Sequence, residues 1–157
     1  MGSLPAGAPP VNGCGGHGGA GALEEKIFEF IQTHEPVTYP ELIHFCERIG
    51  VPGSGDNVQY ASDPSFVYWV GLSDELAAAI VNLHEAGRIF KHPSSALQHI
   101  LGGELPGIPM ARRTRPAYVK PRWVPVAFRT TPYKKPPACR GSRGSKDVYA
   151  PARGVPE

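Results

Sequence analysis

Glycine and proline limit where this chain can form regular structure. There are 19 glycines and 18 prolines in 157 residues, a share close to that of low-complexity segments. They gather in residues 1–21, in several internal loops and in residues 129–157. Apolar residues with a helical or strand period occur between these ends. We therefore expect one small domain over 22–128, with a disordered tail on each side.

Three helices are expected in this domain, each bounded by local signals. Apolar residues at 22–33 recur at helical spacing. Thr38 opens the second helix with TYPE, a capping box in which Glu41 reaches back to the Thr38 amide. Ser73 is the expected N-cap of the third helix, and Gly87 follows its last turn. Cys46 and Trp69 lie among apolar neighbours and are expected in the core.

The segment between the second and third helices, 51–72, is predicted to be a long loop because VPGSGDN and YASDPS are rich in turn residues. Within it, the apolar run FVYWV (66–70) predicts a short buried strand or an extended clamp. A second long excursion, 92–117, contains SSALQHIL, which is suited to a short helix.

Two further segments predict strands. RIFK (88–91) alternates polar and apolar residues directly after the third helix. YVKPRWVPVAF (118–128) is apolar and aromatic, but Pro121 and Pro125 each lack an amide donor. Such a segment is predicted at a sheet edge or as an extended strap.

The order of these elements, helix, short extended Val37–Thr38, helix, helix, strand, long loop, strand, resembles the winged helix-turn-helix family. LHEAGRIFK (83–91) is similar to a recognition helix entering the first wing strand, and residues 118–128 are similar to the returning strand. The resemblance implies an α+β domain of three helices and a small antiparallel β wing, with a role in DNA binding and transcription regulation. The link at 51–72 and the wing at 92–117 are both longer than is usual in that family.

Charge divides the chain into two parts. Residues 1–111 contain four basic and twelve acidic side chains, and residues 112–157 contain twelve basic and two acidic ones. An asymmetry of this size favours a polyanionic or acidic partner for the basic part. A solubilising tail that offsets its own acidic domain is the alternative explanation.

The third helix is a poor candidate for a recognition helix in the usual sense. It carries Asp74, Glu75 and Glu85 and no Lys or Arg, so it would repel the phosphates whose neutralisation supplies most affinity. Asn82 is its one candidate for a base contact.

The basic side chains of the wing and tail are the candidate phosphate contacts, and Tyr118, Trp123 and Tyr133 lie between them. Cations interleaved with aromatic rings are typical of proteins that follow a nucleic-acid backbone. Trp123 is expected to lie partly in the core. The candidates are Arg112, Arg113, Arg115, Lys120, Arg122, Arg129, Lys134, Lys135, Arg140 and Arg143.

We therefore expect a non-catalytic protein that binds DNA or RNA, as a regulator or a ribonucleoprotein component. The alternative is a protein-interaction module or assembly subunit whose acidic helices dock a basic partner, or a homodimer. Basic residues scattered over opposite faces would favour the alternative.

Sequence motifs for other functions are missing. GCGGHG (13–18) matches a dinucleotide fingerprint in letters, but no strand precedes it. The three cysteines and six histidines do not fall at zinc-ligand spacings, so neither a metal nor a cofactor is expected. An enzyme would require a pocket near His92 or His99. Without a signal peptide or an apolar run long enough to span a bilayer, the chain is expected in the cytoplasm or nucleoid.

Overall fold

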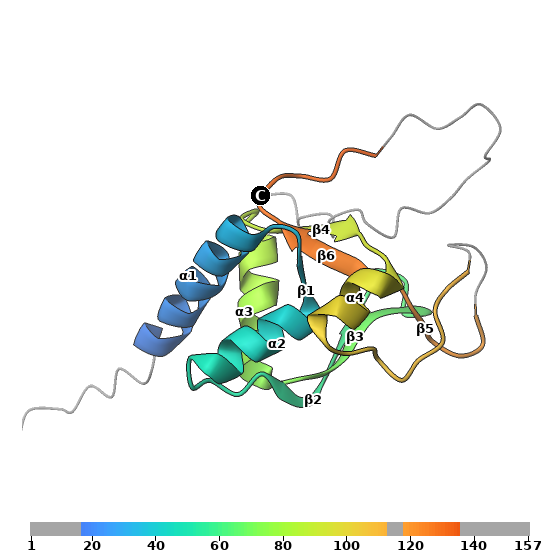
Figure 1. The fold of residues 1–157 in the computed structure, drawn as a ribbon, viewed down its shortest axis with the longest axis horizontal. Coiled ribbons are helices and arrows are strands. Elements are labelled where there is room, and N and C mark those ends of the chain that lie inside the picture. The colour runs from blue at the N-terminus through green and yellow to red at the C-terminus, as the bar shows by residue number, and fades with distance from the viewer. Residues whose placement is uncertain (1–16, 113–117, 136–157) are drawn as a thin grey trace, which may run out of the picture.

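The computed structural model describes residues 17–112 and 118–135, with side chains from residue 21 onward. Four helices and two three-stranded sheets form a mixed α+β fold over these residues (Figure 1). The helices are α1 (His17–His34), α2 (Tyr39–Arg48), α3 (Asp74–Glu85) and α4 (Ala96–Gly102). The strands are β1 (Val37–Thr38), β2 (Ser54–Tyr60), β3 (Phe66–Leu72), β4 (Phe90–Pro93), β5 (Arg122–Trp123) and β6 (Val126–Arg129).

The first sheet joins the beginning of the domain to its end. Its strand order is β1–β6–β4, and both pairs are antiparallel. Val37 pairs with Phe128, and Lys91 pairs with the same residue from the other side. The returning strand β6 is therefore central, with a partner on each side.

The second sheet has the order β2–β3–β5. A hairpin pairs β2 with β3, and β5 adds to β3 in parallel, with Phe66 opposite Arg122. The expected long loop at 51–72 is wrong over Ser54–Tyr60, whereas the run 66–70, predicted as a short buried strand or an extended clamp, lies in β3. The residues of β2 are polar and largely exposed, and irregularities interrupt their register with β3. Pairing with the buried β3 across the hairpin therefore determines this strand, not the strand propensity of its own residues.

The core lies between α1, α2, α3 and the two sheets. Ile27, Leu42 and Ile80 from the three helices are fully buried, as is Phe128 of β6. Trp69 of β3 is also buried, and its ring stacks on Tyr39 with centroids 5.7 Å apart. The core positions expected for Cys46 and Trp69 are thus confirmed.

The local helix signals are confirmed at three places. Glu41 accepts hydrogen bonds from the amide and the hydroxyl of Thr38, each at 2.7 Å. Ser73 Oγ accepts from the Leu76 amide at 3.1 Å, and Gly87 follows the α3 C-cap with φ of 69°. The fourth helix, α4, falls on the segment that suits a short helix, so the described fold has one helix more than the three expected.

The prediction that 118–128 lies at a sheet edge is correct for β5 and wrong for β6. Pro121 precedes β5, and Pro125 lies between the two strands, so neither proline interrupts the ladder of the central strand. The Pro125 carbonyl instead accepts from the Ser94 amide at 3.1 Å. The segment leaves one sheet at Trp123 and enters the other at Val126. Trp123, expected to lie partly in the core, is buried.

The expected boundary of the basic tail at residue 129 also needs correction. Arg129 is the last residue of β6. Thr130 donates hydrogen bonds to the Glu35 carboxylate from both its amide, at 2.6 Å, and its hydroxyl. His92 Nε2 lies 2.6 Å from the Thr131 carbonyl oxygen, and its ring packs edge-on against Tyr133. Residues 129–133 therefore contact the domain.

Candidate nucleic-acid interface

The beginning of α3 is covered by the β2–β3 hairpin and the residues before it. Ser73 Oγ donates to the Pro52 carbonyl at 2.6 Å, and the Ser73 amide donates to the Gly53 carbonyl at 3.0 Å. Asn57 of β2 donates to Asp74 at 3.3 Å. The N-terminal residues of a recognition helix are the ones that contact base edges. Here those positions hold acidic side chains beside a hairpin.

Farther along α3, Asn82 contacts α1. Asn82 Nδ2 donates to Glu24 Oε1 at 2.7 Å. Just beyond α3, Arg88 forms a two-pronged ion pair with Glu25 at 2.9 and 3.1 Å and lies over the ring of Phe28. To contact a base, Asn82 would have to break its hydrogen bond with Glu24, and the base would then lie next to that carboxylate. The helix therefore holds α1 in place.

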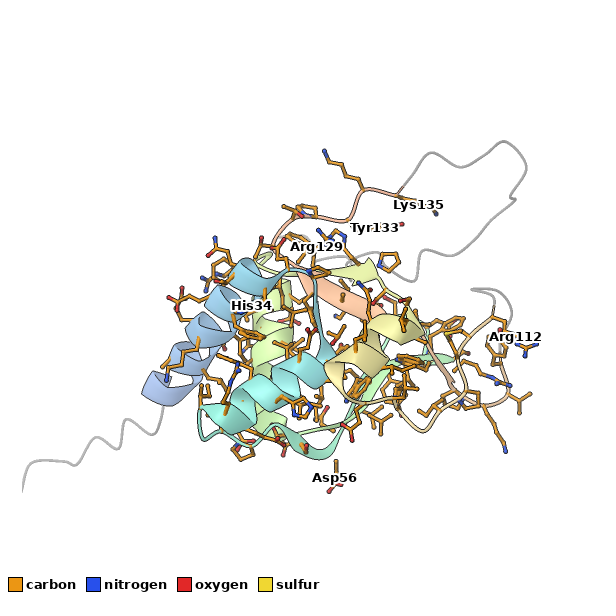
Figure 2. The ribbon with its side chains drawn as sticks, in the orientation of Figure 1. His34, Asp56, Arg112, Arg129, Tyr133 and Lys135 are labelled. Carbon is orange, nitrogen blue, oxygen red and sulfur yellow. The ribbon has the colours of Figure 1, made fainter. Side chains whose placement is uncertain are left out.

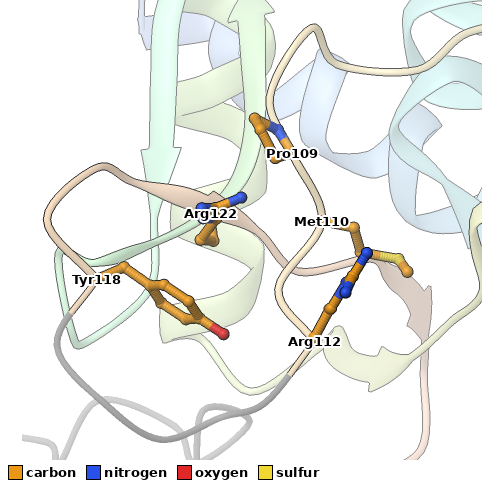
Figure 3. A pocket seen from close by; sticks show the side chains of 5 residues that line it. All are labelled: Pro109, Met110, Arg112, Tyr118 and Arg122. Atoms are coloured by element: carbon orange, nitrogen blue, oxygen red, sulfur yellow. The ribbon is translucent and has the colours of Figure 1, made fainter.

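Two of the candidate arginines line a cavity at the end of β5. The cavity has a volume of about 460 Å³ and is lined by Pro109, Met110, Arg112, Tyr118 and Arg122 (Figure 3). Its size falls in the range of small-ligand sites. Two guanidinium groups, one aromatic ring and two apolar side chains form the lining, a combination suited to an anionic group attached to a flat ring.

Local contacts hold Arg122 in this lining. Its amide donates to the Ser65 carbonyl at 2.9 Å, and its guanidinium lies 5.2 Å from the centre of the Tyr118 ring. Tyr118 in turn packs edge-on against Phe66. Arg122 Nε is buried and has no hydrogen-bond acceptor among the described residues. A buried donor without a protein acceptor is costly and favours an anionic acceptor.

A second group of basic side chains follows β6. Arg129 is half-buried at the strand end, and Lys134 and Lys135 are exposed. Tyr133 lies among them against His92. Figure 2 shows Arg129 and Lys135 along one border of the molecule and Arg112 along the next, while Asp56 lies on the side opposite Lys135.

The described candidates thus lie on two adjoining sides and do not form one cluster. Lys120 is exposed between Tyr118 and β5. The candidates Arg113, Arg115, Arg140 and Arg143 lie outside the described residues.

The sequence did not predict the burial of the titratable side chains Lys91, His84 and His99. Burial lowers the pKa of Lys91 to about 8, and its ammonium lies 5.0 Å from the centre of the Tyr68 ring. Burial, with the charge of Lys91, lowers the pKa of His84 to about 4. Burial also lowers the pKa of His99, whose ring stacks on Trp69 and packs edge-on against Trp123. No local pattern marks these residues, because tertiary packing creates their environments.

Three further observations on the described residues concern other kinds of site. The cavity at β5 includes neither His92 nor His99. In residues 17–112 and 118–135, no three His, Cys, Asp or Glu side chains gather where they could hold a metal ion. Within the same ranges, no helix is both long and apolar enough to cross a bilayer.

Comparison with known proteins adds no assignment. No protein-family model, curated protein or solved structure matches the chain.

Proposed function

We propose that this protein binds nucleic acid without catalysing a reaction, as a DNA-associated regulator or a ribonucleoprotein component in the cytoplasm or nucleoid. Basic side chains at the β5 cavity and along β6 contact the phosphate backbone. The acidic helices form the scaffold that presents them. This assignment rests on chemistry and arrangement, since no relative supports it.

The observation that carries the proposal is the cavity between Arg112 and Arg122. Neither guanidinium has an ion-pair partner among the described carboxylates. By contrast, Arg88 on the helical side is neutralised by Glu25. Unneutralised arginines beside an aromatic ring are suited to a phosphate with its sugar or base stacked nearby.

The arrangement of the first sheet supports a winged-helix variant. Elements α1, β1, α2, α3, β4 and β6 occur in the order that the family resemblance implies, with β2 and β3 inserted before α3, and α4 and β5 inserted before β6. The pairing β1–β6–β4 places the returning strand beside the short strand that follows the first helix. The β2–β3 hairpin covers the beginning of α3. We therefore propose that contact with nucleic acid is made by the wing side, the surface that carries Arg112, Lys120, Arg122, Arg129, Lys134 and Lys135.

The double variant Arg112→Gln/Arg122→Gln tests this role. Removing two phosphate contacts should weaken binding about tenfold, equally for different sequences, and reduce the salt dependence by about one unit of slope for each contact. Fluorescence anisotropy with a DNA duplex, a single strand and a structured RNA measures both quantities.

Arg48→Gln is the matched control, since it removes one exposed positive charge from α2, where Arg48 lies near the rings of Phe30 and Phe45. It should leave binding almost unchanged. If the control weakens binding as much, per charge removed, as the double variant does, general charge attraction explains the binding and the proposed site is wrong.

A further inference from the structure

The segment that leads to Arg112 is tied to β5, so the wall of the β5 cavity is fixed by backbone bonds. Met110 lies opposite Trp123 in a parallel bridge. The Trp123 amide donates to the Pro109 carbonyl at 3.0 Å, and the Ala111 amide donates to the Trp123 carbonyl at 2.8 Å. Since β5 itself pairs with β3, this segment extends the second sheet by one short strand-like piece.

The two arginines of the cavity differ in how far they are exposed. Arg122 is half-buried, and its Nε atom is buried and has no hydrogen-bond acceptor among the described residues. Arg112 is exposed. Figure 3 shows both side chains and the Tyr118 ring around the same space. A buried donor without an acceptor costs stability, so a ligand that supplies the acceptor gains affinity.

The phosphates of a nucleic-acid strand differ in what they present to such a cavity. An internal phosphate carries one negative charge and has a sugar on each side. A terminal phosphate carries a charge of about −1.5 to −2 at pH 7 and three acceptor oxygens, and a sugar is attached on one side only. The terminal group therefore reaches a half-buried donor more easily, and its second charge suits a second guanidinium.

The size of the cavity also favours the end of a strand. Its volume of about 460 Å³ falls in the range for one small ligand, about a single nucleotide. Arg129, Lys134 and Lys135 are not among its lining residues, and Figure 2 shows Arg129 and Lys135 along another border of the molecule. The lining thus provides contacts for one phosphate and its nucleotide, and not for a backbone that enters on one side and leaves on the other.

We propose that the β5 cavity binds the terminal phosphate of a nucleic-acid strand. Arg122 donates to the phosphate oxygens, Arg112 balances the second negative charge, and Tyr118 packs against the adjoining sugar or base. An internal phosphate interacts with the same guanidiniums more weakly. This inference rests on the proposed function, since it names which phosphate of the nucleic acid the cavity holds.

A comparison of strand ends tests the proposal. One single-stranded sequence, labelled at an internal position, is prepared with hydroxyl ends, with a 5′-phosphate and with a 3′-phosphate. Fluorescence anisotropy with the full chain at one fixed salt concentration gives the affinity for each form. One of the two phosphorylated forms should bind about tenfold more tightly than the form with hydroxyl ends.

Three variants show whether this gain comes from the cavity. Arg112→Gln removes an exposed charge from the lining and should reduce the gain to about twofold or less. Lys26→Gln is the matched control, because it removes an exposed charge from α1, which Figure 1 shows on the side of the molecule opposite β5, and it should retain the gain. Arg122→Lys keeps the charge but loses the planar fork of donors, so it should also lose most of the gain. Circular dichroism in the near ultraviolet, where the buried Trp69 and Trp123 absorb, reports that each variant is folded.

The outcomes separate this inference from the proposed function. Equal affinity for all forms of the strand would overturn the inference and leave nucleic-acid binding intact, whereas absence of binding to every form would overturn both. A gain that Arg112→Gln retains as fully as Lys26→Gln would place the terminal phosphate elsewhere and also overturn the inference. A free mononucleotide and a phosphotyrosine peptide are added as competitors. If either binds more tightly than the phosphorylated strand, the cavity serves that ligand and the inference is wrong.

Discussion

At the residue scale, Lys91 places a positive charge inside the domain without a carboxylate partner among the described residues. It lies on β4 beside the ring of Tyr68, and burial lowers its pKa from 10.5 to about 8. Compared with the unfolded state, the folded state thus favours the neutral amine. Its charged form costs stability below about pH 8, and the cost is relieved as pH rises from about 8 to 10.5.

Lys91→Met should therefore stabilise the protein at pH 7, by about 1–3 kcal/mol. The gain should shrink to about a few tenths of a kcal/mol near pH 10.5, where the amine is neutral in the folded state and about half neutral in the unfolded state. Chemical denaturation of both proteins at the two pH values measures the difference. A variant that is less stable than the wild type at pH 7 would mean that the ammonium–ring contact with Tyr68 outweighs the cost of burial.

His84 makes the fold sensitive to acid. Its pKa of about 4 in the folded state lies below its ordinary value of 6.5. The unfolded chain therefore binds the proton more tightly, and stability is lost as pH falls from 6.5 towards 4. His84→Gln should remove about 2–3 kcal/mol of this loss. Unfolding free energies of the wild type and the variant, each measured at pH 7 and pH 4.5, test this prediction. If both proteins lose the same stability between the two pH values, the prediction is wrong. The variant should still lose some stability over this pH range, because burial also lowers the pKa of His99 in the folded state.

At the scale of the elements, the tight contact of α4 with β1 and α2 depends on Gly102. Gly102→Ala should cost about 1–3 kcal/mol, because the added methyl group overlaps Thr38 Oγ1 and approaches Glu41. Gly107→Ala is the matched control, since a Cβ there meets no atom within 4 Å. Thermal unfolding of both variants gives the comparison. Equal stability of the two would show that α4 shifts without cost.

The sequence predicted the elements whose signals are local. Ser73, Gly87 and the Thr38–Glu41 pair define helix ends through contacts a few residues apart, and all are present. The strand β2 was missed because its residues SGDNVQY are polar and its pairing partner lies beyond a turn. The central position of β6 was missed because it depends on β1, about ninety residues earlier in the chain.

Only part of the candidate site could be predicted from the sequence, because its grouping depends on tertiary contacts. The charge of Arg112 and Arg122 can be read from the sequence. Their grouping with Tyr118 around one cavity cannot, since it follows from the parallel pairing of β5 with β3. The hydrogen bond between Asn82 and Glu24, which occupies the side-chain amide of Asn82, is also a tertiary contact.

At the scale of the whole molecule, charge separates along the fold. Acidic side chains lie on α1 and α2, while the described basic candidates follow β5, β6 and the segments beside them. Arg88, which lies near α1 and α3, is held by its ion pair with Glu25. The wing side is thus where a polyanion meets the least repulsion.

The most direct test of this account is a salt titration of binding by the wild-type chain. Fluorescence anisotropy is measured with a DNA duplex, a single strand and a structured RNA, each at several salt concentrations. We predict binding at low salt to at least one of the three, with log Kobs falling linearly against log salt and a slope of about −0.7 to −0.9 for each phosphate contact. Absence of binding to all three at low salt, or binding that salt does not weaken, would contradict the central claim.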